Sequence, residues 1–169
     1  MRGQVRAWRS VWVLTALVAA AVVATAYGNA GYLYAAGYTV ETDVVMVKGA
    51  SVNVLADAKG MTLYYVQSDT PTTSSCAGGC AKIWPPLLSA STPAAEDPLP
   101  GKLAVAKTAN GSQVSYNGHL LYRYSGDSAP HQANGEGVAG KWWVASVDVK
   151  PLAAGTPGKP APKSSSPGW

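Results

Sequence analysis

The chain has few of the residues on which enzyme active sites are commonly built. It contains two histidines and two cysteines in 169 residues, and neither a G-x-S-x-G nor an H-E-x-x-H motif occurs in it. This leaves little material for a nucleophile and its base. A hydrolase would need a carboxylate pair, for which Asp69 and Asp127 are the candidates if they approach across the two halves of the chain. We favour a protein without catalytic residues.

The central part of the sequence also lacks a net positive charge. The formal charge of +4 comes from three arginines near the N-terminus and two lysines near the C-terminus. Residues 39–150 hold eight Lys and Arg against nine Asp and Glu, which gives a net charge of −1. A nucleic-acid partner is therefore not expected. The length suits one modest domain with a core of its own.

The N-terminal segment has no charged residue between positions 10 and 40, and three arginines precede its apolar stretch at residues 11–26. This arrangement predicts one hydrophobic helix, with the N-terminus in the cytoplasm and the rest of the chain outside. Ala24-Thr25-Ala26 fits the cleavage site of a signal peptide. Aromatic residues at both ends, Trp8 and Tyr27 among them, fit a retained membrane anchor instead. We favour the anchor, and both interpretations place the domain outside the cytoplasm, membrane-anchored or secreted.

Composition divides the chain into three parts. Residues 1–38 form the signal peptide or anchor with its linker, and residues 39–150 form the domain. Residues 151–169 are rich in Pro, Ser and Lys, and we expect them to be a disordered tail. The run "SASTPAAEDPLPG" at residues 89–101 is expected to be a loop. It separates two halves, at about 48–88 and 102–150.

The two halves repeat one pattern at an offset of 58 residues. The identical pairs are Gly60 and Gly118, Leu63 and Leu121, Tyr64 and Tyr122, Asp69 and Asp127, and Trp84 and Trp142. Five identities at one offset indicate an internal repeat, in which each half is one supersecondary unit.

Alternation and turn residues predict that both units are built of strands. In the second half, "QVSY" alternates, Asn117-Gly118 predicts a type I′ turn, and "HLLYRY" returns as the partner strand before the strand "KWWVASVDV". In the first half we expect strands at "SVNVLAD", "MTLYYVQ" and around "IWPPLL", where Pro85 and Pro86 restrict pairing to an edge. Each half is predicted to be a β-meander ending on its Trp strand. The prediction is an all-β domain in which two pseudo-symmetric repeats pack together, preceded by the N-terminal helix.

These runs resemble the bacterial secreted-repeat family of predicted lipoproteins, which a Tyr-x-(Phe/Trp/Tyr)-x-x-Asp motif marks. Residues 122–127 fit the motif in full, whereas residues 64–69 have Val66 at the third position. The resemblance covers about residues 48–150. The only cysteines are Cys76 and Cys80, inside the domain, so the lipobox cysteine that lipid attachment needs is missing. The resemblance implies an exported bacterial protein and no particular reaction or ligand.

The segment "CAGGC" predicts a disulfide between Cys76 and Cys80, because the glycines permit a tight turn and export favours oxidation. The alternative is a copper or thiol redox module. Its soft thiolates would bind copper with His119 and Met61, which occupy equivalent places after the two turn glycines. No histidine follows the cysteines as c-type haem attachment requires, and Trp84 stands where a dinuclear copper centre would place one. We expect no cofactor.

The aromatic residues of the motif are expected to be core, since Tyr122 and Tyr124 share one face of a strand and the Asp that ends it can cap the following turn. The alternative is a shallow aromatic platform that binds a glycan or peptide. Its candidate residues are Tyr64, Asp69, Trp84, Tyr122, Tyr124, Asp127 and Trp142. A calcium site at Asp127, Asn134 and Glu136 matches no known spacing of ligands, and His131 in the same loop is expected to be exposed.

Together these observations predict a non-catalytic extracytoplasmic binding or assembly module at the outer face of the membrane. Its expected partners are the membrane, through the N-terminal helix, and other membrane or cell-envelope proteins.

Overall fold

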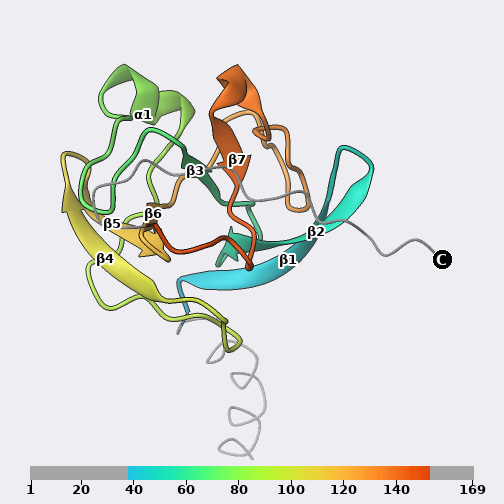
Figure 1. Cartoon of the computed structure of the whole chain (residues 1–169), viewed down its shortest axis with the longest axis horizontal. Coiled ribbons are helices and arrows are strands. Elements are labelled where there is room, and N and C mark those ends of the chain that lie inside the picture. The colour runs from blue at the N-terminus through green and yellow to red at the C-terminus, as the bar shows by residue number, and fades with distance from the viewer. Residues whose placement is uncertain (1–37, 153–169) are drawn as a thin grey trace, which may run out of the picture. The chain divides into compact units, whose positions relative to one another are not determined.

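The structure is a computed structural model that describes residues 38–152, and strands dominate it. In chain order the elements are β1 (Val40–Val47), β2 (Ala50–Asp57), β3 (Tyr64–Val66), α1 (Gly79–Ile83), β4 (Leu103–Thr108), β5 (Gly111–Tyr116), β6 (His119–Leu120), the 3₁₀ turn η1 (Val138–Gly140) and β7 (Trp142–Val144). They form three small antiparallel sheets, β1–β2, β3–β7 and β4–β5–β6 (Figure 1). The all-β prediction is confirmed for these residues. The predicted N-terminal helix and C-terminal tail lie outside them.

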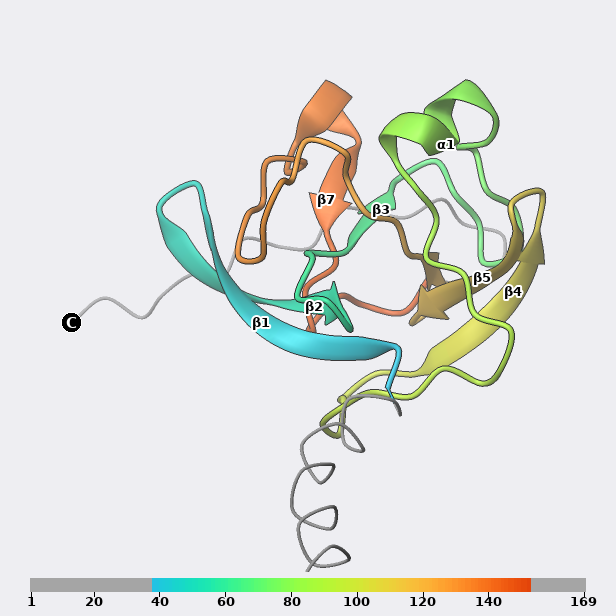
Figure 2. The ribbon, with the colours of Figure 1, turned by 180° about the vertical axis from the view of Figure 1, so that it is seen from behind.

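Two long hairpins lie on opposite sides of the domain, with β3 and β7 between them (Figures 1 and 2). One hairpin is β1–β2 and the other is β4–β5. The predicted type I′ turn after β5 is confirmed, because Asn117 and Gly118 have φ angles of 52° and 86°. β1 begins before the predicted first half, and β4 was not among the predicted strands. Few residues of either strand are buried, so their sequences show no clear alternation of apolar and polar residues.

The third strand of the second half pairs with the hairpin of the first half. Ala145, just after β7, accepts a hydrogen bond from the Leu55 amide (N···O 2.8 Å) and donates one to the Leu63 carbonyl (2.8 Å). The β3–β7 ladder continues this pairing, with Tyr64 opposite Val144. The prediction that each half forms a meander of its own is therefore wrong, because β7 completes the other repeat.

The first half contributes its third segment to the second half in the same way. Leu87 accepts a hydrogen bond from the Val114 amide (2.8 Å) and donates one to the Leu121 carbonyl (2.9 Å). Pro86 forms a bridge with Tyr122, which matches the pairing of Val144 with Tyr64. The two repeats have thus exchanged their third strands. Neither has a complete set of strand partners without the other.

The exchange shows how far the internal symmetry extends. Residues after the turn that follows β2 in the first repeat and β5 in the second correspond at the offset of 58, as predicted. Residues of β2 and β5 just before this turn correspond at 59, because Leu55 and Val114 make matching bonds, whereas their partners in the outer strands, Thr42 and Val105, are 63 residues apart. The difference comes from the turn, since three residues separate Asp57 from Met61 where two separate Tyr116 from His119. The pseudo-symmetry therefore includes both hairpins and the strands that they exchange.

The two tryptophans of the repeat do not lie in the same secondary structure. Trp142 begins β7, but Trp84 is the C-cap of the short helix α1, and no regular strand follows it. The predicted strand around "IWPPLL" exists only as single bridges at Pro86 and Leu88. Proline lacks an amide donor, so this segment accepts hydrogen bonds, as Pro85 does from Arg123 (2.8 Å), without forming a full ladder.

The core consists of two apolar clusters, and each contains residues of both repeats. One surrounds Leu55, Leu63, Val114 and Leu121, and the other surrounds the aromatic residues of the motif. Within residues 38–152, no helix has the length and apolar character needed to cross a membrane.

The exchange predicts that neither repeat folds alone. A chain divided between Pro100 and Gly101, inside the loop that joins the repeats, should give two fragments (residues 38–100 and 101–152) that are each unfolded by circular dichroism and by NMR shift dispersion. An equimolar mixture should recover the native spectrum, because each fragment supplies the strand that the other needs. A fragment with dispersed amide signals on its own would contradict the exchange.

Candidate functional site: the aromatic and carboxylate residues of the repeat motif

The motif residues of the two repeats meet where the strands cross. Tyr64 and Tyr122 exchange backbone hydrogen bonds, with N···O distances of 2.8 Å from Tyr64 to Tyr122 and 2.9 Å in the reverse direction. Both side chains are fully buried. The first tyrosine of each motif therefore lies beside its counterpart, near the axis that relates the repeats.

Each of these tyrosines bonds to the aspartate of the other repeat. The Tyr64 hydroxyl donates to Asp127 Oδ2 (2.6 Å), and the Tyr122 hydroxyl donates to Asp69 Oδ2 (2.7 Å). The aspartates are 2% (Asp69) and 7% (Asp127) exposed. Such charge-assisted hydrogen bonds are among the stronger ones in proteins. The motif thus links one repeat to the other.

The remaining oxygen of each aspartate caps the loop that follows it, as predicted. Asp69 Oδ1 accepts hydrogen bonds from the backbone amide and the hydroxyl of Ser75, both at 2.7 Å. Asp127 Oδ1 accepts one from the Asn134 amide (3.0 Å). Each carboxylate therefore fixes the path of its own loop and the position of a tyrosine from the other repeat.

Burial sets the ionisation of these groups. It raises the pKa of the Asp69 and Asp127 carboxyls above their usual range, and the hydrogen bonds that they accept oppose this shift. Burial, aided by the neighbouring carboxylates, also raises the pKa of the Tyr64 and Tyr122 hydroxyls. Both tyrosines therefore remain protonated donors at neutral pH.

The tryptophans of the two repeats stack on each other. The rings of Trp84 and Trp142 lie 3.8 Å apart and are parallel, with 1° between their planes. Each ring also meets the tyrosine of its own repeat edge-on, Tyr64 against Trp84 at 5.5 Å and Tyr122 against Trp142 at 5.2 Å. The edge-on contacts have a favourable geometry for aromatic pairs. Tyr124 stacks on the outside of Trp84 (4.2 Å) and is only half-buried.

The cluster is core rather than an open platform. Apart from Tyr124, the candidate platform residues are buried, so they present no aromatic surface to a glycan or peptide. Two surface hollows lie instead along residues 89–103 and β4. The buried tyrosines and aspartates of the motif therefore position the two repeats.

Cys76 and Cys80 form a disulfide, with their Cα atoms 5.2 Å apart. The Asn110 amide donates to the Cys76 carbonyl (2.9 Å), which attaches this loop to the turn between β4 and β5. While the bond is intact, neither sulfur is a thiolate that could ligate copper.

His119 and Met61, the other two residues of the copper alternative, make contacts of their own. His119 is buried against Tyr65, with ring centroids 4.4 Å apart, and its Nε2 lies 2.9 Å from the Lys150 carbonyl. Burial lowers the pKa of His119. The Met61 amide bonds to Asp57 (3.1 Å). Among residues 38–152, no three His, Cys, Asp or Glu side chains are grouped in a way that could hold a metal ion.

The residues of the calcium alternative also have other roles. Glu136 accepts a hydrogen bond from the Val144 amide (3.0 Å) and pairs with Lys48 (3.3 Å), while Asn134 bonds to Asp127 through its backbone. His131 is exposed, as expected, and its Nδ1 lies 2.9 Å from both carboxylate oxygens of Asp43.

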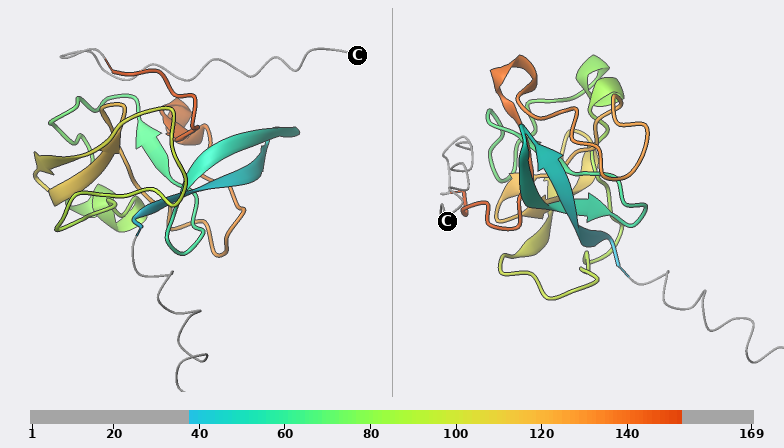
Figure 3. Two further views of the ribbon diagram at one scale, coloured as in Figure 1. Left: turned by 90° about the horizontal axis from the view of Figure 1, so that it is seen from below. Right: turned by 90° about the vertical axis from the view of Figure 1, so that its right-hand side faces the viewer.

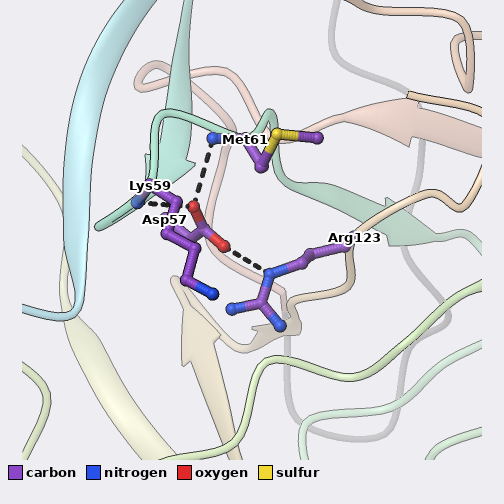
Figure 4. Close-up of polar contacts among 4 residues, drawn as sticks. All are labelled: Asp57, Lys59, Met61 and Arg123. Carbon is purple, nitrogen blue, oxygen red and sulfur yellow. Dashed lines mark hydrogen bonds and ion pairs between the residues drawn. The ribbon is translucent and has the colours of Figure 1, made fainter. Parts of the chain in front are cut away.

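One charged pair was not identified from the sequence. Asp57 ends β2, and its side chain is 2% exposed. Its Oδ1 accepts the Lys59 amide (2.8 Å) and the Met61 amide (3.1 Å), and its Oδ2 accepts Arg123 Nε from the other repeat (Figure 4). Comparison of the repeats could have indicated this pair, because Arg123 occupies the motif position that Tyr65 holds in the first copy.

The chain belongs to a family described as a secreted repeat of unknown function. The model of this family matches residues 46–88 and again residues 104–146, so both repeats are copies of one unit. The resemblance inferred from the motif is thereby confirmed, and an extracytoplasmic location follows from the family. No curated protein and no solved structure matches the chain significantly.

Removal of one hydroxyl that links the repeats should destabilise the domain. Tyr64→Phe and Tyr122→Phe each leave a buried carboxylate without one donor, which should cost about 1–3 kcal/mol of unfolding free energy. The two losses should be similar, because the repeats use the same bond. Denaturant unfolding measures them, with Tyr38→Phe, whose hydroxyl bonds to Glu41 outside the cluster, as the control. Wild-type stability in both variants would contradict the structural role of the motif.

Loss of the disulfide should have an effect of similar size. The double variant Cys76→Ser/Cys80→Ser should lose about 2 kcal/mol of stability, the value that loop-closure entropy gives for so short a ring. The native protein should also resist thiol alkylation until it is reduced. Two alkylatable thiols in the native protein would overturn the disulfide assignment.

Proposed function

We propose that this protein is a non-catalytic binding or assembly module, held at the outer face of the membrane by its N-terminal segment, which pairs its strand β1 with an extended segment of another envelope protein. The motif supports a scaffold role, since its hydroxyls and carboxylates are occupied by bonds between the repeats. The observation that carries the proposal is the open edge of β1.

The turn of the first hairpin determines which backbone groups of β1 face outward. Lys48 and Gly49, with φ angles of 50° and 85°, form a two-residue turn, so Val47 and Ala50 pair through hydrogen bonds. Because such pairs alternate in an antiparallel ladder, every second residue of β1 directs its amide and carbonyl away from β2. These residues are Thr42, Val44 and Met46.

No other strand covers those outward groups in the part of the chain that the structure describes, and the Val44 amide donates to the carboxylate of its neighbour, Asp43 Oδ1 (2.7 Å). The next residue in the series, Val40, bonds to Ala94 (3.2 Å) and Glu96 (2.9 Å). The segment around residues 94–96 therefore covers the edge of β1 at Val40. The side chains of Val44 and Met46 are 60% and 62% exposed. The tip of the hairpin extends away from the rest of the domain (Figure 3). An apolar open edge is a template for strand addition.

The proposal can be tested in native membranes with a photo-crosslinking residue at position 44. We expect cross-links to one discrete partner, and their loss when the same probe is combined with Met46→Lys. The control is the same probe at Val105 of β4, which is 37% exposed and lies on the other hairpin. Surface changes of this kind should leave thermal stability nearly unchanged. Equal cross-linking at both positions, or none at position 44, would count against the proposal.

A further inference from the structure

The Asp57–Arg123 pair interrupts the symmetry of the domain. At the equivalent place in the other half, the same two backbone positions carry Tyr116 and Tyr65. Asp57 bonds to Met61 across its turn as Tyr116 pairs with His119, and Arg123 follows Tyr122 as Tyr65 follows Tyr64. Tyr116 and Tyr65 are fully buried members of one apolar cluster. Of the two equivalent places in the domain, one therefore holds a pair of aromatic rings and the other holds a pair of charged side chains.

The comparison indicates that folding does not require charge at this place. Well-packed apolar side chains in place of a buried ion pair are often neutral or stabilising, because both charges lose their hydration. The scaffold already provides such an aromatic solution in its other half. The buried Asp57 carboxylate is satisfied by its three donors, and its effect is to hold the guanidinium of Arg123 in one orientation.

The held guanidinium still has donors to offer. Asp57 bonds to Nε, and the two Nη nitrogens have no partner among the described residues. Figure 4 shows them directed away from the Asp57 carboxylate, with the side chain of Lys59 extending to the same side. Lys59 is exposed, and its ammonium group has no ion pair within residues 38–152. Arg123 is 37% exposed, so solvent reaches this place.

We propose that Arg123 and Lys59 bind a carboxylate group of a ligand. The two Nη donors form a planar fork that matches the two oxygens of a carboxylate, and Lys59 adds a second cation. Asp57 cancels one of the two positive charges, so the three side chains together suit a singly charged anion. Glu41, the acidic residue beside Gly60, accepts the Tyr38 hydroxyl (3.0 Å) and forms no ion pair with Lys59 or Arg123 among the described residues. Since Asp57 holds the arginine in place, binding does not have to order it.

The site is separate from the β1 edge, and NMR of the purified full-length chain tests it. Titration with sodium acetate, against sodium chloride at equal ionic strength, should give saturable shifts of the Arg123 Nε–H and the Lys59 amide. Lys59→Met should weaken acetate binding about fivefold, the effect of one exposed charge contact. The matched variant Lys102→Met, at an exposed lysine of the second half, should bind acetate as the wild type does. Shifts that do not saturate, or equal weakening in both variants, would overturn the proposal.

A second variant removes the arginine without leaving a buried charge unpaired. Asp57→Asn/Arg123→Gln should stay folded, as judged by the near-ultraviolet signal of the stacked tryptophans, and should lose acetate binding. Retained acetate shifts at Lys59 in this variant would also contradict the site. A peptide with a free C-terminal carboxylate, compared with its C-terminal amide, identifies the source of the ligand. Tighter binding of the free peptide than of acetate indicates a protein chain, and equal binding indicates a small organic acid.

Discussion

The structure depends on the exchange of strands between its two repeats. Each hairpin lacks a neighbouring strand, and the other repeat supplies it through Ala145 in one direction and Leu87 in the other. The tyrosine–aspartate bonds of the motif cross the same boundary, so the backbone pairing and the side-chain pairing reinforce each other. Polar groups buried at this boundary are costly without their partners. The two repeats are therefore required to fold as one unit.

This exchange explains why the motif has no open face. A tyrosine and an aspartate in a repeated motif could serve a ligand if they were exposed, but here each carboxylate fixes a loop and a tyrosine of the other repeat. The two places for which we propose binding lie outside these bonds. These are the charged pair of Asp57 and Arg123, and the apolar edge of β1 at Val44 and Met46. In a duplicated scaffold, one copy can keep a packing role while the other acquires a new surface.

Much of this architecture can be predicted from the sequence, since the offset of 58, the Asn117-Gly118 turn and the buried motif are local patterns. The pairing of the third strands cannot, because alternation and turn residues indicate where a strand is and not which partner it has. The analogy with Trp142 predicts a strand at Trp84, but Trp84 ends a helical turn and Pro85, which follows it, cannot donate to a strand ladder. The charged pair was missed because Arg123 occupies a variable position of the motif, and Asp57 lies outside it.

The most direct test of the central claim is native-state hydrogen exchange of the amides that cross between the repeats. If the exchanged strands make one cooperative unit, the amides of Leu55, Leu87, Val114 and Ala145 should all exchange through global unfolding. Their free energies of opening should then agree with one another and with the value from denaturant unfolding. A lower free energy for the amides of one repeat, with the other still protected, would show that the repeats unfold separately and would contradict this account.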